Sequence, residues 1–282
     1  DVDDLCEGLN YCLKHRKVLG ANGRELAKAW TWAKAAEMVA GVYRLAMEEQ
    51  PATASVVIPV YNKSESQLIR AIQSCQGQTL QPKLILVVND GSPNTEEIKA
   101  CIAKFDYNYR VRYIEQPNSG VAVARNSGIS HTDSKYITCL DSDDWLEPTF
   151  LEACVRELEQ DRSLGIAYTG LRAHNADGSN VVSQWPGKFD PDRQLTYTKK
   201  QNQVPTACVF RRDAWERVGG YKSRYCPDGA GSEDAAFWSA ICSIAYNAKK
   251  VKDEALFHYS AEGGFVHGNQ DYSEVDWLSM DP

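Results

Sequence analysis

The sequence lacks any long apolar run. Its longest purely apolar stretch lies around Leu84 to Val88, far short of the roughly 18 residues that a helix needs to cross a bilayer. It also lacks an excess of basic residues, with 31 Lys and Arg against 38 Asp and Glu, whereas a sequence-independent grip on nucleic acid requires clustered cations. We therefore expect no transmembrane segment and no nucleic-acid partner.

The sequence shows no closely spaced cysteine pair, and its first residues are not those expected of a secretory leader. The nine cysteines are scattered and include no C-x-x-C pair, so neither a zinc site nor a disulfide framework is indicated, and core packing is expected. Residues 1–4 are acidic and do not resemble the basic start of a signal peptide. These features predict a cytoplasmic location, either free or peripheral to the inner face of a membrane.

The composition is that of a globular protein. Hydrophobic residues make up 43% and charged residues 24% of the 282 positions, which suits one large domain or a domain with an appendage. The formal net charge of -7 makes polyanions poor candidates for binding partners. It leaves room for a small phosphorylated ligand, because a bound divalent cation can reverse the local field.

Two amphipathic helices are predicted within residues 1–50. Leu5, Leu9 and Leu13 repeat every four residues, and a similar pattern follows the break at Asn22 and Gly23. Their apolar stripes must be covered by another surface. The pattern changes near residue 51, so we expect a helical segment over 1–50 and a separate domain over 51–282.

From residue 51 onward, short β-rich runs alternate with helical patterns. Such alternation predicts an α/β fold with a mainly parallel central sheet and helices on both faces, in which ligands bind at the carboxyl ends of the strands. Residues 170–200 are polar and are expected to form irregular loops. The expected strands are 55–59, 83–88, 110–114, 136–140 and 165–168, and the expected helices are 64–76, one starting near 94, 121–129, 148–158 and 235–246.

Polar residues follow the first two expected strands. The first strand ends in Ile-Pro-Val-Tyr-Asn over 58–62, where Pro59 is expected to stop the strand, and the second ends in Asn89 and Asp90 before a glycine. Asp90 could accept a hydrogen bond from a nucleobase. An ordinary strand end and an Asx-turn explain the same residues structurally.

A glycine turn leads into the next helix. Asn118-Ser119-Gly120 precedes the helix that carries Arg125, and an arginine there could reach a base or a phosphate. A solvent-exposed surface arginine is the structural alternative.

The strongest signal is Asp141-Ser142-Asp143-Asp144, which follows a buried strand directly. Three carboxylates in one turn repel each other unless a cation compensates, and Mg²⁺ or Mn²⁺ prefers such oxygen ligands. Helix capping would explain one aspartate but not all three. Glu233 and Asp234 begin a later helix, where complementing the helix dipole is an equally good explanation.

Taken together, these segments resemble the inverting family 2 glycosyltransferases of GT-A fold. The motifs IPVYN, DGS, N-x-G with a later A-R-N, D-x-D-D and E-D occur in the family's order over about residues 53 to 260. The agreement of order and spacing is far more specific than any single motif.

The resemblance implies roles for particular residues. Five positions would form the nucleotide pocket: Pro59 and Tyr61 beside the nucleobase, Asp90 bonding it, and Asn118 and Arg125 completing the pocket. Asp141 would face the ribose and the metal, Asp143 would be the principal ligand of Mn²⁺ or Mg²⁺, and Asp234 would be the catalytic base.

Two positions depart from the family pattern. Asn89 stands where the family more often has Asp, although Asp90 is kept. His258 is a candidate for completing the metal site, but its surroundings, His-Tyr-Ser, do not match the usual Tyr-Arg-x-His. Donor binding is expected to survive the first departure, and the second leaves metal completion open.

The expected activity is inverting transfer of a sugar from a nucleotide diphosphate donor, with UDP as the implied nucleotide, to a hydroxyl of a glycan, lipid-linked or protein acceptor. A catalytically silent GT-A-like module that binds a nucleotide or a partner is the alternative. A sugar nucleotidyltransferase would need a glycine-rich phosphate loop after its first strand, and residues 61–64 contain no glycine.

The N-terminal segment carries a second resemblance. Residues 19–24, Leu-Gly-Ala-Asn-Gly-Arg, and the helix through Val42 and Tyr43 resemble the C-terminal end of a GT-B, family 4 glycosyltransferase. This implies that the chain belongs to a larger polypeptide with two enzymes. A simple helical appendage is the alternative.

Overall fold

The computed structural model describes residues 53–105, 110–174, 180–183, 189–190, 203–222, 233–251 and 256–260. The chain divides into two units, Asp1–Pro51 and Ala52–Pro282, and all the described residues belong to the second. The helical segment predicted over residues 1–50 lies outside the described residues. Its helices, its GT-B resemblance and the domain organisation built on it stay predictions.

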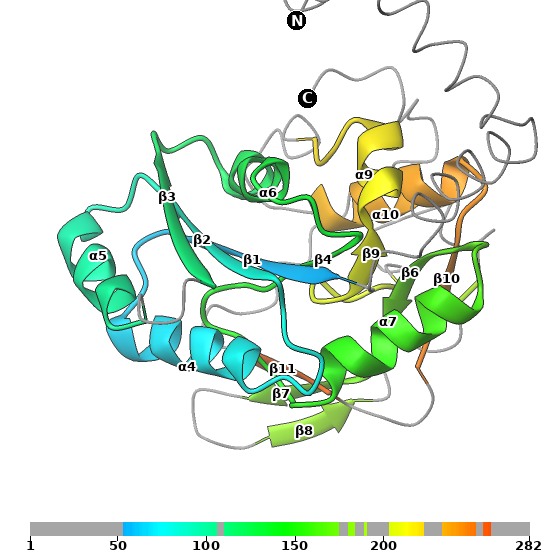
Figure 1. The fold of residues 1–282 in the computed structure, drawn as a ribbon, viewed down its shortest axis with the longest axis horizontal. Coiled ribbons are helices and arrows are strands. Elements are labelled where there is room, and N and C mark those ends of the chain that lie inside the picture. The colour runs from blue at the N-terminus through cyan, green and yellow to red at the C-terminus, as the bar shows by residue number, and fades with distance from the viewer. Residues whose placement is uncertain are drawn as a thin grey trace, which may run out of the picture. The chain divides into compact units, whose positions relative to one another are not determined.

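A seven-stranded sheet, ordered β10-β6-β9-β4-β1-β2-β3, forms the centre of the second unit (Figure 1). Strands β4, β1, β2 and β3 are parallel neighbours, and β10 is parallel to β6. The α/β fold with a mainly parallel sheet is therefore confirmed. The strands are β1 (Ala54–Val60), β2 (Leu84–Asp90), β3 (Val111–Gln116), β4 (Tyr136–Cys139), β6 (Leu164–Tyr168), β9 (Val209–Arg211) and β10 (Asn247–Lys250).

Strands β9 and β10 were not predicted, and β9 runs antiparallel between β4 and β6. A parallel neighbour needs a crossover connection, usually a helix. The described chain between β6 and β9 contains two further strands instead, β7 (Leu171–His174) and β8 (Asn180–Ser183). The sheet is consequently mixed at this side.

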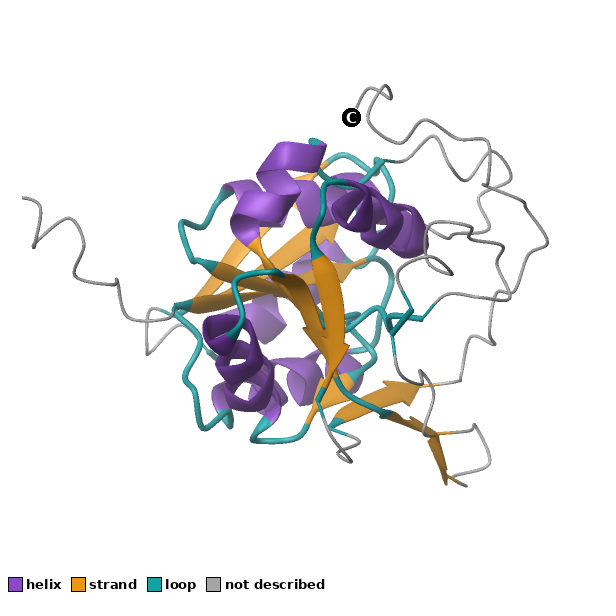
Figure 2. Ribbon diagram, turned by 90° about the vertical axis from the view of Figure 1, so that its right-hand side faces the viewer, coloured by secondary structure: helices purple, strands orange, loops and turns teal. Residues whose placement is uncertain are grey.

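Helices cover both faces of the sheet (Figures 1 and 2). Successive residues of β1 alternate between faces: Val56 and Ile58 belong to one buried cluster and Val57 to the other. The first cluster includes α4 (Glu65–Gln76), α5 (Thr95–Ala103) and α7 (Phe150–Gln160). The second includes α6 (Val121–Ser130), α9 (Arg212–Val218) and α10 (Glu233–Ser243).

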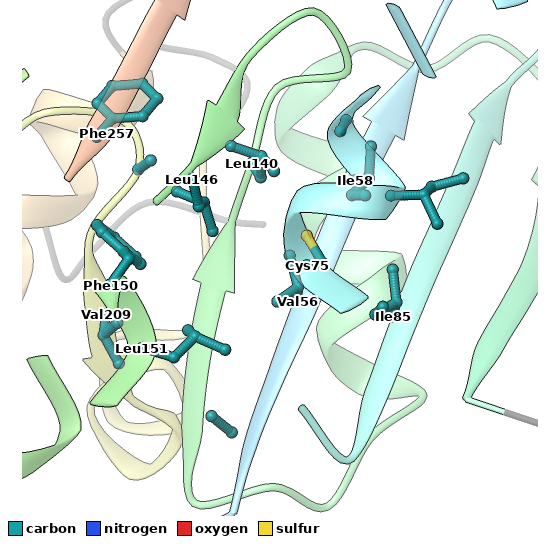
Figure 3. Packing of buried hydrophobic residues seen from close by; sticks show 14 of the residues in the cluster. Val56, Ile58, Cys75, Ile85, Leu140, Leu146, Phe150, Leu151, Val209 and Phe257 are labelled. Atoms are coloured by element: carbon teal, nitrogen blue, oxygen red, sulfur yellow. The ribbon is translucent and has the colours of Figure 1, made fainter. Parts of the chain in front are cut away.

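A second, four-stranded sheet has the order β5-β11-β7-β8, where β5 is Trp145–Leu146 and β11 is Phe257–Ser260. It packs onto the first cluster through Leu146, Leu171 and Phe257, two of which are drawn with their neighbours in Figure 3. The expectation of irregular loops over 170–200 was wrong for β7 and β8. Strand β7 pairs with the distant β11, and β8 pairs with β7, so a contact far along the chain, which leaves little signal in the local sequence, supports both.

Several local predictions can be compared with the structure. The helix expected over 64–76 is confirmed as α4, with Ser64 and Gln67 forming a capping box at its start. Asn94 lies at the N-cap of α5 without a side-chain capping bond; its Nδ2 donates to the carbonyl oxygen of Lys63 at 3.1 Å, and its Oδ1 has no hydrogen-bond partner. Helix α7 begins at Phe150, two residues after Pro148.

The six described cysteines are free and buried, as expected for core residues. No helix in the described part of the chain has the length and apolarity needed to span a bilayer.

Candidate active site

The residues singled out in the sequence follow adjacent strands at one edge of the large sheet. Because β4, β1, β2 and β3 are parallel, their carboxyl ends meet at the same edge. Tyr61 follows β1 and is 51% exposed, Asp90 ends β2, the exposed Asn118 follows β3, and Asp141 follows β4. The topology thus gathers segments that lie up to about 80 residues apart, such as Tyr61 and Asp141.

Pro59 does not stop its strand, contrary to the expectation, because β1 continues to Val60. The carbonyl oxygen of Val57 accepts a hydrogen bond from the N–H of Leu140 at 2.9 Å. The backbone nitrogen of Pro59, two residues further along, faces the same side of β1 as the Val57 carbonyl group. At that point β4 has already ended, at Cys139. Its missing N–H therefore leaves no ladder bond unmade. Its place beside a nucleobase stays a prediction.

The buried carboxylate of Asp90 fixes the turn before α6. Its Oδ1 accepts hydrogen bonds from Gln116 Nε2 at 2.8 Å and from the N–H of Ser119 at 2.9 Å, and its Oδ2 accepts from the N–H of Gly120 at 2.8 Å. Gly91 has a φ of 68°, and a Cβ there would lie 2.6 Å from the nitrogen of Asn118. Asp90 thus shapes the loop that carries Asn118; a bond from Asp90 to the base and a place for Asn118 in the nucleotide pocket stay predictions.

Asn89, the departure from the family pattern, is fully buried and hydrogen-bonded on both sides. Its Oδ1 accepts from the N–H of Ser92 at 3.0 Å, and its Nδ2 donates to Thr95 Oγ1 and to Tyr113 Oη, each at 2.8 Å. An aspartate could not donate either of the last two bonds. The Asn89 amide therefore supplies both the donor and the acceptor that its neighbours require. The sequence alone gave no indication of these bonds.

Arg125 is the buried centre of the arrangement, 2% exposed, and not a surface arginine. Its helix α6 lies tightly on the sheet, since a Cβ at Gly128 would come 2.4 Å from Val57 Cγ1. Its Nη1 donates to Glu233 Oε1 at 2.6 Å, and its Nη2 donates to Asp141 Oδ1 at 3.0 Å. The arginine therefore joins the turn after β4 to the first turn of α10.

The charge of Arg125 is balanced by these two acids. Burial disfavours the guanidinium cation, but the carboxylates of Asp141 and Glu233 outweigh it and raise the pKa of Arg125 well above its ordinary value. The guanidinium also lies 5.4 Å from the centre of the Tyr221 ring. Asp141 keeps 33% of its side chain exposed, so part of it remains open to solvent.

Asp143 lies in the same turn and pairs with a lysine that the sequence analysis did not single out. Lys63 Nζ lies 2.5 Å from Asp143 Oδ2, and the Asp143 side chain is 17% exposed. Arg70 of α4 donates through Nη2 to the carbonyl oxygen of Asp143 at 2.7 Å. The turn is thus held by two basic residues from the β1–α4 segment.

The third acid of the turn, Asp144, is buried and only half satisfied. Its Oδ1 accepts from the N–H of Ser260 in β11 at 2.8 Å, whereas its Oδ2 has no hydrogen-bond partner. Burial first, and then the charges of Asp141 and Asp143, raise the pKa of Asp144 well above its ordinary value. Asp144 therefore takes up a proton at a higher pH than an ordinary aspartate.

Asp234 lies in the first turn of α10, next to the Glu233 that Arg125 binds. Its Oδ1 accepts from the N–H of Ala235 at 2.7 Å, and its Oδ2 accepts from Thr206 Oγ1 at 3.2 Å. Burial, followed by the charge of Glu233, raises the pKa of Asp234 to about 6. A carboxylate with this pKa is ionised at neutral pH and is basic enough to accept a proton.

His258 is bonded to other protein groups rather than to the acids of the turn. Its Nε2 lies 2.7 Å from Glu147 Oε1, its Nδ1 lies 2.8 Å from His174 Nε2, and its ring stacks on Trp145 at 4.8 Å. Within the described ranges, no group of three or more His, Cys, Asp or Glu residues is arranged to hold a metal ion. Sequence reasoning missed this histidine pair, because β7 itself was missed.

The chain is similar to a known protein family over most of the large sheet. The family "Glycosyl transferase family 2" matches residues 55–219. Chondroitin synthase of Pasteurella multocida (strain Pm70) is 36% identical over 210 residues, which are 71% of this chain and 21% of that protein. EpsJ of Bacillus subtilis (strain 168), described as an uncharacterized glycosyltransferase, is 31% identical over 219 residues, 73% of this chain and 60% of EpsJ.

Among solved structures, TarS 1-349 of S. aureus in complex with UDP-GlcNAc matches with a TM-score of 0.60 at 16% identity, covering 79% of this chain and 61% of that one. This likeness shows a shared GT-A-like fold. The chain spans about a fifth of the P. multocida chondroitin synthase. From the family match over most of the sheet, together with these relatives, the chain belongs to glycosyl transferase family 2.

Proposed function

We propose that the chain transfers a sugar from a UDP-sugar to a hydroxyl of a growing polysaccharide, with inversion at the anomeric carbon and with Mn²⁺ or Mg²⁺ bound. The UDP-GlcNAc complex of TarS supports a UDP-sugar donor. The names of two relatives, chondroitin synthase and hyaluronan synthase of P. multocida, support a polysaccharide acceptor over a lipid-linked or protein acceptor.

The observation that carries this proposal is the buried bridge made by Arg125. It binds Asp141 in the turn after β4 and Glu233 at the start of α10. Asp234 is the next residue after Glu233, so the acids expected at the donor and the acid expected to act as base are held beside one another.

In the proposed reaction, Asp234 accepts the proton of the acceptor hydroxyl as that oxygen attacks the anomeric carbon. The attack comes from the face opposite the UDP diphosphate, which leaves with the electron pair of the broken bond, so a single displacement inverts the centre. Thr206 and the N–H of Ala235 hold the carboxylate through its two oxygens. Its pKa of about 6 suits a base at neutral pH.

The acids of the turn suit a divalent cation. Asp141 and Asp143 present partly exposed carboxylates, with side chains 33% and 17% exposed, and Mg²⁺ or Mn²⁺ completes such a pair with water and substrate phosphates. When bound, the ion supplies Lewis-acid stabilisation of the charge that develops on the leaving diphosphate. Lys63 must leave Asp143 for the ion to bind there.

The assignment of the base is tested with Asp234→Asn. The change should lower kcat by about 10² to 10⁴ because general-base assistance is lost, and should leave UDP affinity measured by calorimetry unchanged. Asp213→Asn is the matched control, since Asp213 lies in the first turn of α9, and it should transfer sugar at the wild-type rate. Full activity in Asp234→Asn would reject Asp234 as the base.

A silent nucleotide-binding module is the second candidate, and one observation favours it. Asp143 is neutralised by Lys63 within the chain itself, so the turn is balanced without a metal ion. The two candidates differ in turnover: a silent module binds UDP but releases no sugar from a panel of UDP-sugars. Release of free sugar by the chain in the presence of Mn²⁺ would rule it out.

A further inference from the structure

Lys63 combines a hydrogen-bonded backbone with a partly exposed side chain that reaches Asp143. The N–H of the preceding Asn62 donates to Ser92 Oγ at 3.1 Å, and Asn94 Nδ2 donates to the carbonyl oxygen of Lys63 at 3.1 Å. The lysine side chain is 34% exposed and meets Asp143 through its ammonium group. The root of the side chain is therefore held by the segment after β2, while its end depends on one partly exposed ion pair.

The acids of the turn are neutralised from different directions. Arg125 is buried and binds both Asp141 and Glu233. If Arg125 moved away, these two carboxylates would lose their shared countercharge. The pair of Lys63 with Asp143 is partly open to solvent, and such pairs contribute little net stability. A divalent cation at Asp143 would repel the ammonium group, so Lys63 is the residue that gives way.

We propose that Lys63 is an exchange cation: it neutralises Asp143 in the empty protein and moves to the diphosphate of the donor when a divalent cation takes Asp143. This inference rests on the proposed function, because it needs a nucleoside diphosphate and a metal ion at this turn. A lysine suits the task, since its ammonium group is a compact charge on a flexible stem and binds phosphate oxygens from several directions.

The test is a pair of calorimetric titrations on Lys63→Met in the full chain. Mn²⁺ alone should bind about fivefold more tightly than to wild type, because the competing ion pair is gone. UDP in saturating Mn²⁺ should bind about tenfold more weakly, because a charge-assisted bond is lost. Lys63→Arg keeps the charge and should show both effects in reduced form.

Lys83→Met is the matched control. Lys83 also pairs with an aspartate, Asp133, at 2.6 Å, but it precedes β2 and so lies at the opposite edge of the sheet. Its replacement should change neither titration. Thermal unfolding of all variants shows that each is folded before binding is compared.

A second variant needs no metal ion. Asp143→Asn frees Lys63, so UDP in metal-free buffer should bind about fivefold more tightly than to wild type. The double variant Lys63→Met/Asp143→Asn should lose this gain. A gain that persists in the double variant would come from removing the Asp143 charge alone and would overturn the exchange.

The outcomes separate this inference from the proposed function. Unchanged Mn²⁺ or UDP affinity in Lys63→Met overturns the exchange, whatever the activity. The expected affinity changes in a chain that never transfers sugar support the exchange and refute the proposed function alone. A wild-type chain that binds neither Mn²⁺ nor UDP refutes both.

Discussion

Replacing Arg125 with Met should destabilise the domain strongly. Arg125 is 2% exposed and makes bonds of 2.6 and 3.0 Å to Glu233 and Asp141. Breaking a buried ion pair costs about 3–5 kcal/mol, because a charge is left without its partner. Glu233 carries most of this loss, since its side chain is 12% exposed and that of Asp141 is 33% exposed.

We therefore expect the free energy of unfolding to fall by about 3 kcal/mol in Arg125→Met, the lower end of the range for a buried pair. In a domain of this size that is a fall in Tm of roughly 6–12 °C. Urea denaturation followed by circular dichroism measures the first quantity, and calorimetry measures the second. Arg125→Lys keeps the charge but not the fork that reaches both acids, so it should fall between wild type and Arg125→Met.

A double variant separates the ion pair from packing. Arg125→Met/Glu233→Met removes both charges, and replacement of a buried pair by apolar residues is often nearly neutral. It should be more stable than Arg125→Met alone. A loss below about 1 kcal/mol in Arg125→Met, the level of an exposed pair, would refute the view that this bridge holds α10 to the turn after β4. So would a double variant less stable than the single one.

Two further predictions concern Asp234 and Asn89. With its pKa raised to about 6, Asp234 is ionised above that pH, so kcat/KM should fall tenfold per unit as pH drops below it. Glu233→Gln removes the Glu233 charge, the second cause of the raised pKa of Asp234, and should move the acidic limb of the pH–rate profile to lower pH. A pH-independent profile would contradict the assignment of Asp234 as the base. Asn89→Asp should lower the free energy of unfolding by about 1–3 kcal/mol, because the hydroxyls of Thr95 and Tyr113 lose their donor. Urea denaturation tests this, and wild-type stability would show that the network rearranges without loss.

Five strands of the large sheet, β1, β2, β3, β4 and β6, could be predicted because their apolar patterns are visible in the local sequence, whereas β9 and β10 could not. Strands β1 and β2 are buried over nearly their whole length, and such continuous apolar runs between helices indicate a parallel sheet. Strand β9 has three residues, and β7 has one buried residue among four. Their existence depends on distant partners, which neither periodicity nor composition records.

The site was predictable as a set of segments but not as a set of contacts. The parallel topology brings Asp90, Asn118 and Asp141 to one edge, as the strand ends suggested. The partners of Arg125 lie 16 and 108 residues away, and no local pattern distinguishes a buried bridge from a surface charge. His258 was a reasonable metal candidate by residue type, but its ring nitrogens are bonded to Glu147 and His174.

The bond from the N–H of Ser260 to Asp144 has a consequence for how the protein is made. A ribosome delivers the whole seven-stranded sheet by residue 250, the end of β10, before β11 has been synthesised. A polypeptide terminated prematurely between these two strands would keep its sheet but leave a buried carboxylate without that donor, at a cost of about 1–3 kcal/mol. Translation must therefore reach the last described strand before the acidic turn acquires its final shape.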